Sequence, residues 1–289
     1  MDSCLVGSEM CIRDSVCFDE NLNEVKRLNL KSRINSDIVP SFGALKVNKL
    51  LISELLEEKK SSYYMLKELN NFLSFYKPSI FLGYNSINFD EEFLRQALWE
   101  FFKYPYVTST QENKRGDVLN LVTMAHAFNP KAINVEKNDE GRLIFKLESL
   151  ASVNNFKVEN SHEAISDVLA TKELLRLVKN NEPTIFKNFF QNTNKLSLVK
   201  KIVENGLFTV HGYFFSKHFI YLATNLFEHP VYNNYFLAFD LKYDPEDIVF
   251  LETEQLKDIY YTKKFNGKNF NCFKKLKLNK QPSILEASY

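Results

Sequence analysis

The stretch SIFLGYNSINFDEEFLRQAL, residues 79–98, runs from a short apolar segment through an acidic residue into an amphipathic pattern. The segment IFLG is typical of a buried strand. Beyond it, Phe93, Ala97 and Leu98 recur at the spacing of one helical face, and three acids precede them at the positive end of that helix. The stretch therefore predicts a strand, a turn and a helix, with Asp90 at the junction.

The flanking segments continue the alternation of strand and helix. Residues 16–30 read as extended chain with a hairpin turn at DENLNE, and residues 61–76 carry a helical pattern that Pro78 ends. Residues 116–128 and 161–180 predict two further helices. This order indicates the α/β class, with a mixed sheet and helices.

The second part of the chain has a different sequence pattern. FTVHGYF, FIYLATNLF, YFLAFDLK and IVFLE are short, aromatic-rich strand candidates separated by turns. They predict a smaller, β-rich domain over residues 183–289, after an α/β domain over residues 16–182. A length of 289 residues fits two domains, because one domain typically takes roughly 100–200 residues.

The first fifteen residues, MDSCLVGSEMCIRDS, show neither helical nor strand periodicity. They resemble a translated adaptor sequence of the kind found at the ends of proteins predicted from environmental DNA. We therefore set residues 1–15 aside as a non-native leader. On this interpretation the natural protein begins further upstream.

Composition narrows the classes of partner. With 37 Lys and Arg against 36 Asp and Glu, the net charge is +1, so nucleic-acid binding requires local basic patches. The four cysteines match no zinc-binding spacing, which favours free thiols in a reducing cytoplasm. No apolar run reaches the ~18–20 residues that a membrane span needs.

Three residues are candidates for chemistry. Asp90 follows a strand at the kind of crevice where α/β sheets bind ligands, although an acid there also serves as an ordinary N-cap. His162 and Asp167 open the last long helix of the α/β domain. Five positions along a helix turn by about 500°, so their side chains share no face, and a solvated histidine remains the alternative.

The combination is more informative than its parts. A strand–Asp–helix unit followed by H-x-x-x-x-D resembles the second and third motifs of DEDD-type 3′→5′ exonucleases. GYNSINFDEEFLRQAL, RGDVLNLV, PKAIN, FKLESLASVNN and SHEAISDVLATKELLRLVK resemble, in order, segments of the bacterial exodeoxyribonuclease I family. HPVYNNYFLAFDLKYDPEDIVFLETEQLKDIYYT and KLNKQPSIL resemble the SH3-like domain of that family. The resemblance runs from Val16 to the end and implies a ribonuclease H-like exonuclease domain before the SH3-like one.

The resemblance implies a function and residue roles. Asp90 becomes the second-motif acid, Asp167 the third-motif acid, and His162 the general base. The two acids would ligate two Mg²⁺ or Mn²⁺ ions for phosphodiester hydrolysis. Asn85 and Lys146 would contact nucleic acid. The implied enzyme is a cytoplasmic monomer that degrades single-stranded DNA to 5′-mononucleotides in DNA repair and recombination, with single-strand DNA-binding protein as a partner and no membrane association.

Two departures from the family bear on activity. The family carries a first motif, D-x-E, on its opening strand, and neither residues 1–15 nor FDENLNE contains it; the adjacent Asp19 and Glu20 lie on the expected turn. The chain stops at SILEASY, where the family continues into a helical domain. We therefore expect an internal fragment that is inactive as it stands. Lys146 also stands where the family typically has an arginine. A lysine keeps the positive charge but cannot make the bidentate hydrogen bonds that arginine makes to phosphate.

A basic segment in the second domain has two interpretations. Residues 260–280 interleave lysines with aromatic residues and contain no acid, as in single-strand binders, and the candidate contacts are Lys263, Lys264, Lys274 and Lys275. A β-hairpin with its aromatic side chains inward is the alternative. For the chain as a whole, an RNA exonuclease resembling ribonuclease T or oligoribonuclease and a non-catalytic single-strand-binding fragment also stay open.

Overall fold

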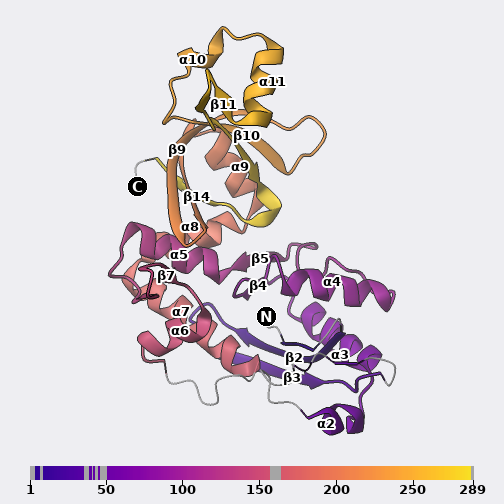
Figure 1. The fold of residues 1–289 in the computed structure, drawn as a ribbon. Helices are drawn as coiled ribbons and strands as arrows, with labels where there is room; N and C mark the ends of the chain where they lie inside the picture. Colours follow the sequence, from indigo (N-terminus) through magenta and orange to yellow (C-terminus); the bar gives the residue numbers. More distant parts are fainter. Residues whose placement is uncertain are drawn as a thin grey trace. The chain divides into compact units, whose positions relative to one another are not determined.

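The computed structural model divides the chain into two compact units, Met1–Phe186 and Lys187–Tyr289 (Figure 1). Each unit is described by itself. The functional domain bounds at residues 16–182 and 183–289 stay a prediction. The structure describes residues 4–6, 9–35, 39–40, 42, 45, 51–156 and 164–287.

The first unit opens with an antiparallel sheet of β1 (Cys4–Val6), β2 (Glu9–Phe18) and β3 (Glu24–Lys31), in that order. Strand β2 pairs with β3 from Ile12 opposite Lys31 to Phe18 opposite Glu24. Part of the segment that we set aside as a leader is thus strand. Its periodicity did not predict this, because strand pairing needs only backbone N–H and C=O groups.

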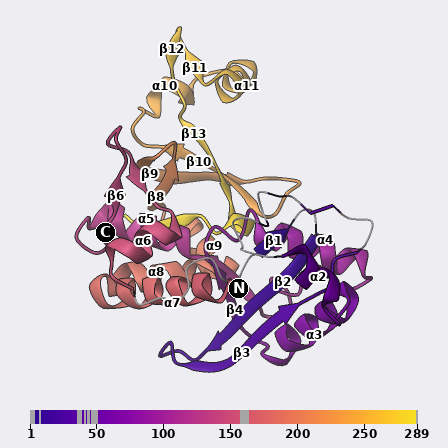
Figure 2. The ribbon, with the colours of Figure 1, turned by 60° about the horizontal axis from the view of Figure 1, so that its bottom comes forward.

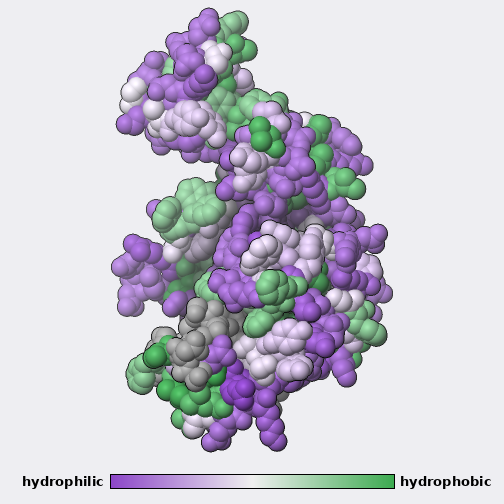
Figure 3. Space-filling view, turned by 90° about the vertical axis from the view of Figure 1, so that its right-hand side faces the viewer, coloured by the Kyte–Doolittle hydropathy of each residue, from purple (hydrophilic) through white to green (hydrophobic). Residues whose placement is uncertain are grey.

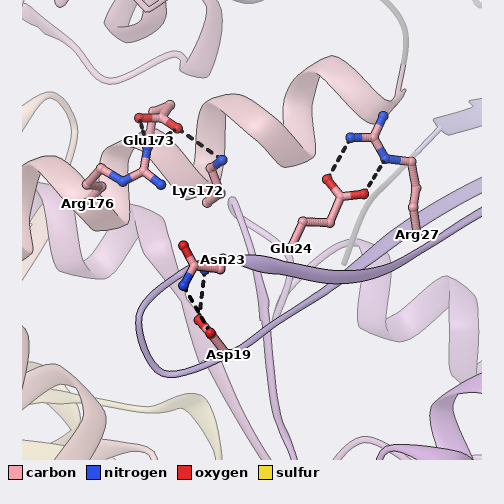
Figure 4. A network of polar contacts seen from close by, with 7 residues as sticks. All are labelled: Asp19, Asn23, Glu24, Arg27, Lys172, Glu173 and Arg176. Carbon is pink, nitrogen blue, oxygen red and sulfur yellow. Dashed lines mark hydrogen bonds and ion pairs between the residues drawn. The ribbon is translucent and has the colours of Figure 1, made fainter.

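The turn between β2 and β3 is held by Asp19, as Figure 4 shows. Its carboxylate accepts the backbone N–H groups of Asn21 and Asn23 at 2.9 and 2.8 Å and the side chain of Asn23 at 3.1 Å. Lys179 on α7 (Ala164–Asn181) donates to the carbonyl of Glu20 at 3.1 Å, which ties the turn to that helix. The expected hairpin is confirmed, and Asp19 has a structural role there.

The strand and the helix predicted for the opening stretch are both present, and the helix predicted over residues 61–76 lies beside β3 (Figure 2). Helix α3 (Ser62–Phe75) precedes β4 (Ile80–Gly83), and α4 (Asp90–Glu100) follows it. The apolar faces of α3 and α4 bury side chains in one core with β3 and β4. That core contains Leu30, Met65, Leu66, Leu69, Leu73, Phe81, Leu94, Leu98 and Val107.

Further elements complete the first unit. The short helix α2 (Ile52–Glu57) lies before α3, and β5 (Lys114–Asp117) leads directly into α5 (Val118–Phe128). A hairpin of β6 (Glu136–Lys137) and β7 (Leu143–Ile144) then precedes α6 (Leu147–Val153). Helix α7 contacts α5, α6 and β2. Helix α8 (Pro183–Asn192) spans the division between the units.

The second unit is a five-stranded antiparallel sheet in the order β13-β10-β9-β8-β14. Its long strands are β8 (Leu207–Phe214), β9 (Lys217–Glu228) and β10 (Tyr235–Asp240). The remaining two are β13 (Phe273–Lys277) and β14 (Ser283–Glu286), and α9 (Lys195–Val203) contacts the sheet at β8, β9 and β14. The predicted β-rich domain is therefore confirmed.

One predicted strand of this unit is wrong. IVFLE, residues 248–252, falls on the end of α10 (Glu246–Val249) and on the loop before α11 (Thr253–Thr262). Asp244 accepts the N–H of Glu246 at 3.0 Å, and Glu252 and Gln255 form a capping box. Local capping thus outweighs strand propensity here. Ile248 and Leu251 still pack against the small core around Phe239, whereas Phe250 is 89% exposed.

The basic segment at residues 260–280 supplies the end of α11, the hairpin β11 (Lys264–Phe265) and β12 (Lys268–Asn269), and β13. Phe270 and Cys272 are buried with Phe239 and Ile259 in a second small core. Most of its aromatic rings thus face inward, as the hairpin interpretation expects.

On the face drawn in Figure 3, hydrophilic residues predominate and hydrophobic ones form small separate groups. Among the described helices, none combines the length and apolar composition that crossing a bilayer requires.

Lys201 provides a test of the packing in the second unit. Its ammonium group is buried and donates to Asn188 Oδ1 at 2.8 Å and to Asn192 Oδ1 at 3.0 Å. Burial lowers its pKa to about 8. Between that pH and about 10.4 the unfolded chain binds the proton more tightly, so this group makes the free energy of unfolding rise with pH.

We expect Lys201→Met to flatten that rise when urea unfolding is measured from pH 7.5 to 10.5. Lys200→Met is the control, because the Lys200 side chain is 70% exposed and should leave the slope unchanged. An unaltered slope in Lys201→Met would show that Lys201 titrates normally in the folded protein.

Candidate active site

The candidate site lies where two parallel strands end. Strand β4 pairs with β5 from Ile80 opposite Lys114 to Gly83 opposite Asp117. The loop Tyr84–Phe89 leaves the end of β4, and Asp90 begins α4 directly after it. The carboxyl ends of parallel strands share one edge of a sheet, which is the usual ligand-binding edge in α/β folds.

The sequence did not predict β5. Its sequence, KRGD, has no apolar run and no alternation, and only pairing with β4 makes it a strand. Asp117 was overlooked with it. The available signal was an acid immediately before a helical pattern, because Asp is a preferred N-cap residue.

Asp117 is 4% exposed and receives three backbone N–H groups. Its Oδ1 accepts from Asn85 at 2.7 Å and from Leu119, in the first turn of α5, at 3.1 Å. Its Oδ2 accepts from Ile87 at 3.2 Å. One carboxylate therefore caps a helix and holds the loop that leads to Asp90.

Burial raises the pKa of Asp117, and the nearby charge of Asp90 raises it further. The three backbone hydrogen bonds act in the opposite direction. Asp90 is itself 5% exposed. The structure thus brings the predicted second-motif acid next to a second buried carboxyl group.

The start of α4 is anchored to β5 by a buried ion pair. Glu91, 4% exposed, accepts a hydrogen bond from Thr108 Oγ1 at 2.6 Å and contacts Arg115 Nη1 at 3.3 Å. Arg115 belongs to β5, two residues before Asp117. These contacts fix the helix end that carries Asp90.

Of the predicted DNA contacts of the first unit, Asn85 lies in this loop and Lys146 lies next to a residue that the loop contacts. Asn85 has a left-handed backbone (φ 56°) and an exposed side chain. Tyr84 donates its hydroxyl to the carbonyl of Phe145 at 2.6 Å, and the exposed Lys146 follows as the N-cap of α6. The hydrogen bond therefore links the segments that carry Asn85 and Lys146.

The third motif is only partly described. Asp167 is exposed in the first turn of α7, while His162 lies outside the described residues. Carboxylate oxygens are suitable donors for Mg²⁺ or Mn²⁺. Within the described part of the chain, however, no three His, Cys, Asp or Glu side chains form a group that could hold a metal ion. Asp90 and Asp167 thus supply the right donor type without a complete set.

The candidate lysines of the second unit differ in their surroundings. Lys274 pairs with the buried Asp240 at 3.4 Å, whereas Lys275, its neighbour on β13, is exposed and lies over the Tyr235 ring at 4.2 Å. Lys263 lies over Tyr260 at 4.4 Å, and Lys264 is exposed on β11. Their nucleic-acid contacts stay a prediction. Lys277, which the sequence did not single out, also faces the Tyr235 ring, at 5.7 Å.

Two family profiles match the chain. The one described as Exonuclease matches residues 51–175, which include Asp90 and Asp167, and the one described as Exonuclease I SH3-like domain matches residues 191–289. The exodeoxyribonuclease I of Escherichia coli is 30% identical over 260 residues, 87% of this chain and 54% of the relative. The chain is a homologue of bacterial exodeoxyribonuclease I.

The second relative supports the same family. The exodeoxyribonuclease I of Haemophilus influenzae is 32% identical over 217 residues, 71% of this chain and 46% of the relative. This homologue thus spans about half the length of the curated relatives it matches. It covers their exonuclease and SH3-like domains and is shorter than the full-length enzyme.

Solved structures agree on the fold. Escherichia coli exonuclease I in complex with a dT13 oligonucleotide has a TM-score of 0.80 at 24% identity, over 95% of this chain and 61% of that one. A structure described as the ExoI/SSB-Ct complex has a TM-score of 0.78 at 24% identity, over 95% and 60%. The predicted fold, an exonuclease domain followed by an SH3-like β domain, is confirmed.

The ion pair at the start of α4 gives a stability prediction. Arg115→Met leaves Glu91 buried without its cation, and we expect the free energy of unfolding to fall by about 3 kcal/mol, as for other broken buried pairs. Urea unfolding monitored by circular dichroism measures this loss.

Arg142→Met is the matched control, because Arg142 and Glu140 form a pair in which both side chains are 63% exposed. Its effect should stay below about 1 kcal/mol. Equal effects of the two variants would contradict a special role for the buried pair.

Proposed function

We propose that the protein from which this chain comes is a 3′→5′ exonuclease that degrades single-stranded DNA to 5′-mononucleotides in DNA repair and recombination. The observation that carries the proposal is the position of Asp90, buried at the carboxyl edge of parallel β4 and β5 beside Asp117. Membership of the exodeoxyribonuclease I family, on both domains, supports the same chemistry.

We assign the site residues as follows. Asp90 and Asp167 would each offer carboxylate oxygens to Mg²⁺ or Mn²⁺, and His162 would take the proton from the attacking water. The ions, when bound, supply a hydroxide nucleophile and stabilise the leaving 3′-oxygen. Asn85 and Lys146 would position the DNA strand at its 3′ end.

Binding of the substrate beyond the site is assigned to the second unit. Lys263, Lys264, Lys274 and Lys275 would contact phosphates, and the exposed Lys275 beside Tyr235 is the best placed of them. The relative solved with an oligonucleotide supports a single strand as ligand, and the relative solved with SSB-Ct supports single-strand DNA-binding protein as a partner.

A non-catalytic single-strand-binding role is the second candidate for this chain. It is favoured by the lack, within the described residues, of a three-member group of metal-ligand side chains. The RNA exonuclease alternative is less favoured, because the SH3-like profile over residues 191–289 belongs to exonuclease I.

The test compares two forms of the protein on 3′-labelled single-stranded DNA and on matched RNA with Mg²⁺. One form is this chain, and the other carries an opening strand with D-x-E before Val16. We expect the second form to release mononucleotides from DNA. His162→Ala in that form should lower kcat by about 10²–10⁴-fold, the usual loss of a general base. Asp90→Asn, which removes a proposed metal ligand, should abolish turnover.

Asp139→Asn is the control for loss of one negative charge, because Asp139 is exposed on the turn between β6 and β7. It should leave turnover unchanged. If the D-x-E form binds DNA without cleaving it, the result would support the binding role and contradict the exonuclease proposal. Preferential cleavage of RNA would favour the ribonuclease alternative.

A further inference from the structure

The carboxylate of Asp117 connects β5, α5 and the loop Tyr84–Phe89. We propose that Asp117 is a positioning residue, which holds this loop so that Asn85 and Asp90 face the substrate and the metal ions. The inference rests on the proposed function, because it assigns a role to a residue beside the same site. Asp117 itself touches neither reactant in this scheme.

The two oxygens of Asp117 do different work. Oδ1 accepts from Leu119 and Asn85, so it caps α5 and holds the beginning of the loop. Oδ2 accepts from the middle of the loop, at Ile87. Ile87 is 2% exposed, so water is a poor substitute for this acceptor.

The loop continues without a break into α4. The carbonyl of Ser86 accepts N–H groups from Phe89 at 3.2 Å and from Glu91 at 3.0 Å. Ser86 lies between the two residues whose N–H groups Asp117 binds. A displacement of Ile87 therefore reaches the first turn of α4, where Asp90 lies.

The left-handed backbone at Asn85 also depends on this contact. A φ of 56° is uncommon for residues other than glycine, although asparagine tolerates it better than most. The bond from Asn85 N–H to Asp117 Oδ1, 2.7 Å long, favours this conformation. It thereby sets the direction of the exposed Asn85 side chain.

A carboxylate suits this position better than an amide. Both oxygens of Asp117 accept hydrogen bonds from N–H groups, whereas asparagine has one oxygen and an NH₂ group. Asp117→Asn can keep the Oδ1 contacts to Leu119 and Asn85. It places an NH₂ group against the N–H of Ile87, where two donors face each other.

The first measurement is amide hydrogen exchange of the full chain, resolved by NMR. In Asp117→Asn, the Ile87 amide should exchange about tenfold faster than in the parent chain, since a buried hydrogen bond is lost. In Asp117→Ser, which retains an N-cap for α5 but does not reach the loop, Asn85 and Ile87 should both exchange faster.

Asn113→Ala is the matched control. Asn113 is also buried; its Oδ1 accepts from Ser79 N–H at 2.9 Å and its Nδ2 donates to the Val107 carbonyl at 2.7 Å. It acts at the opposite end of the same two strands. Its loss should destabilise the unit while leaving the relative protection of Ile87 unchanged.

The second measurement separates kcat from KM in the form that carries D-x-E. Asp117→Asn should lower kcat at least tenfold with little change in KM, whereas Asn113→Ala should retain kcat at temperatures where it is folded. A purely structural role of Asp117 predicts the same retention of kcat in both variants.

The outcomes distinguish the two proposals. If the form with D-x-E and intact Asp117 cleaves nothing, the proposed function fails, and hydrogen exchange still reports whether Asp117 holds the loop. If Ile87 exchanges at the parent rate in both Asp117 variants, or if Asn113→Ala matches Asp117→Asn in exchange and in kcat, the positioning role is overturned.

Discussion

The buried carboxylate of Asp117 is the contact on which the arrangement of the candidate site depends. Backbone N–H groups that are removed from water require acceptors, and a loop at a strand end has no ladder to provide them. Asp117 meets this requirement for Asn85, Ile87 and Leu119 together. Without it, the end of β4 and the starts of α4 and α5 would lose a common acceptor.

The cost of this arrangement is electrostatic. Asp90 and Asp117 are both buried, and burial together with the charge of Asp90 raises the pKa of Asp117. Glu91 adds a third buried acid, which Arg115 and Thr108 compensate. Burying several acids together costs free energy, and buried carboxyl groups with raised pKa values, as at Asp117, are frequent at functional sites.

Sequence patterns predicted the elements that bury apolar side chains. Helix α3, strand β4 and helix α4 follow the predicted segments because each carries a stripe or a run of residues that the core requires. The α/β class and the β-rich second domain follow from the same signal. Asp90 was identified correctly as the residue at the junction, because its place depends on its neighbours in the chain.

Elements that depend on backbone pairing or on helix capping, and not on a buried apolar face, were not predicted. Strand β5 forms by pairing its backbone with β4, and the first part of β2 forms by pairing with β3. Backbone pairing does not require alternating apolar residues, so the hydrophobic pattern of these segments did not reveal it. IVFLE carries strand propensity, but capping at Asp244 and Glu252 directs its surroundings into helices. The sequence treated the adjacent Lys274 and Lys275 alike, but they lie on opposite sides of one strand, so that Lys274 pairs with Asp240 and Lys275 is exposed over Tyr235.

The sequence by itself determined the class of fold, the order of its main elements and the family resemblance, because these depend on local spacing and composition. Only the tertiary structure decided that Asp117 holds the loop before Asp90, that Glu91 is paired across to Arg115, and which lysines are already engaged. Those contacts join residues 17 to 34 positions apart. The physical reason is that a hydrogen bond between distant segments depends on how strands pair and helices pack, which residue spacing alone does not specify.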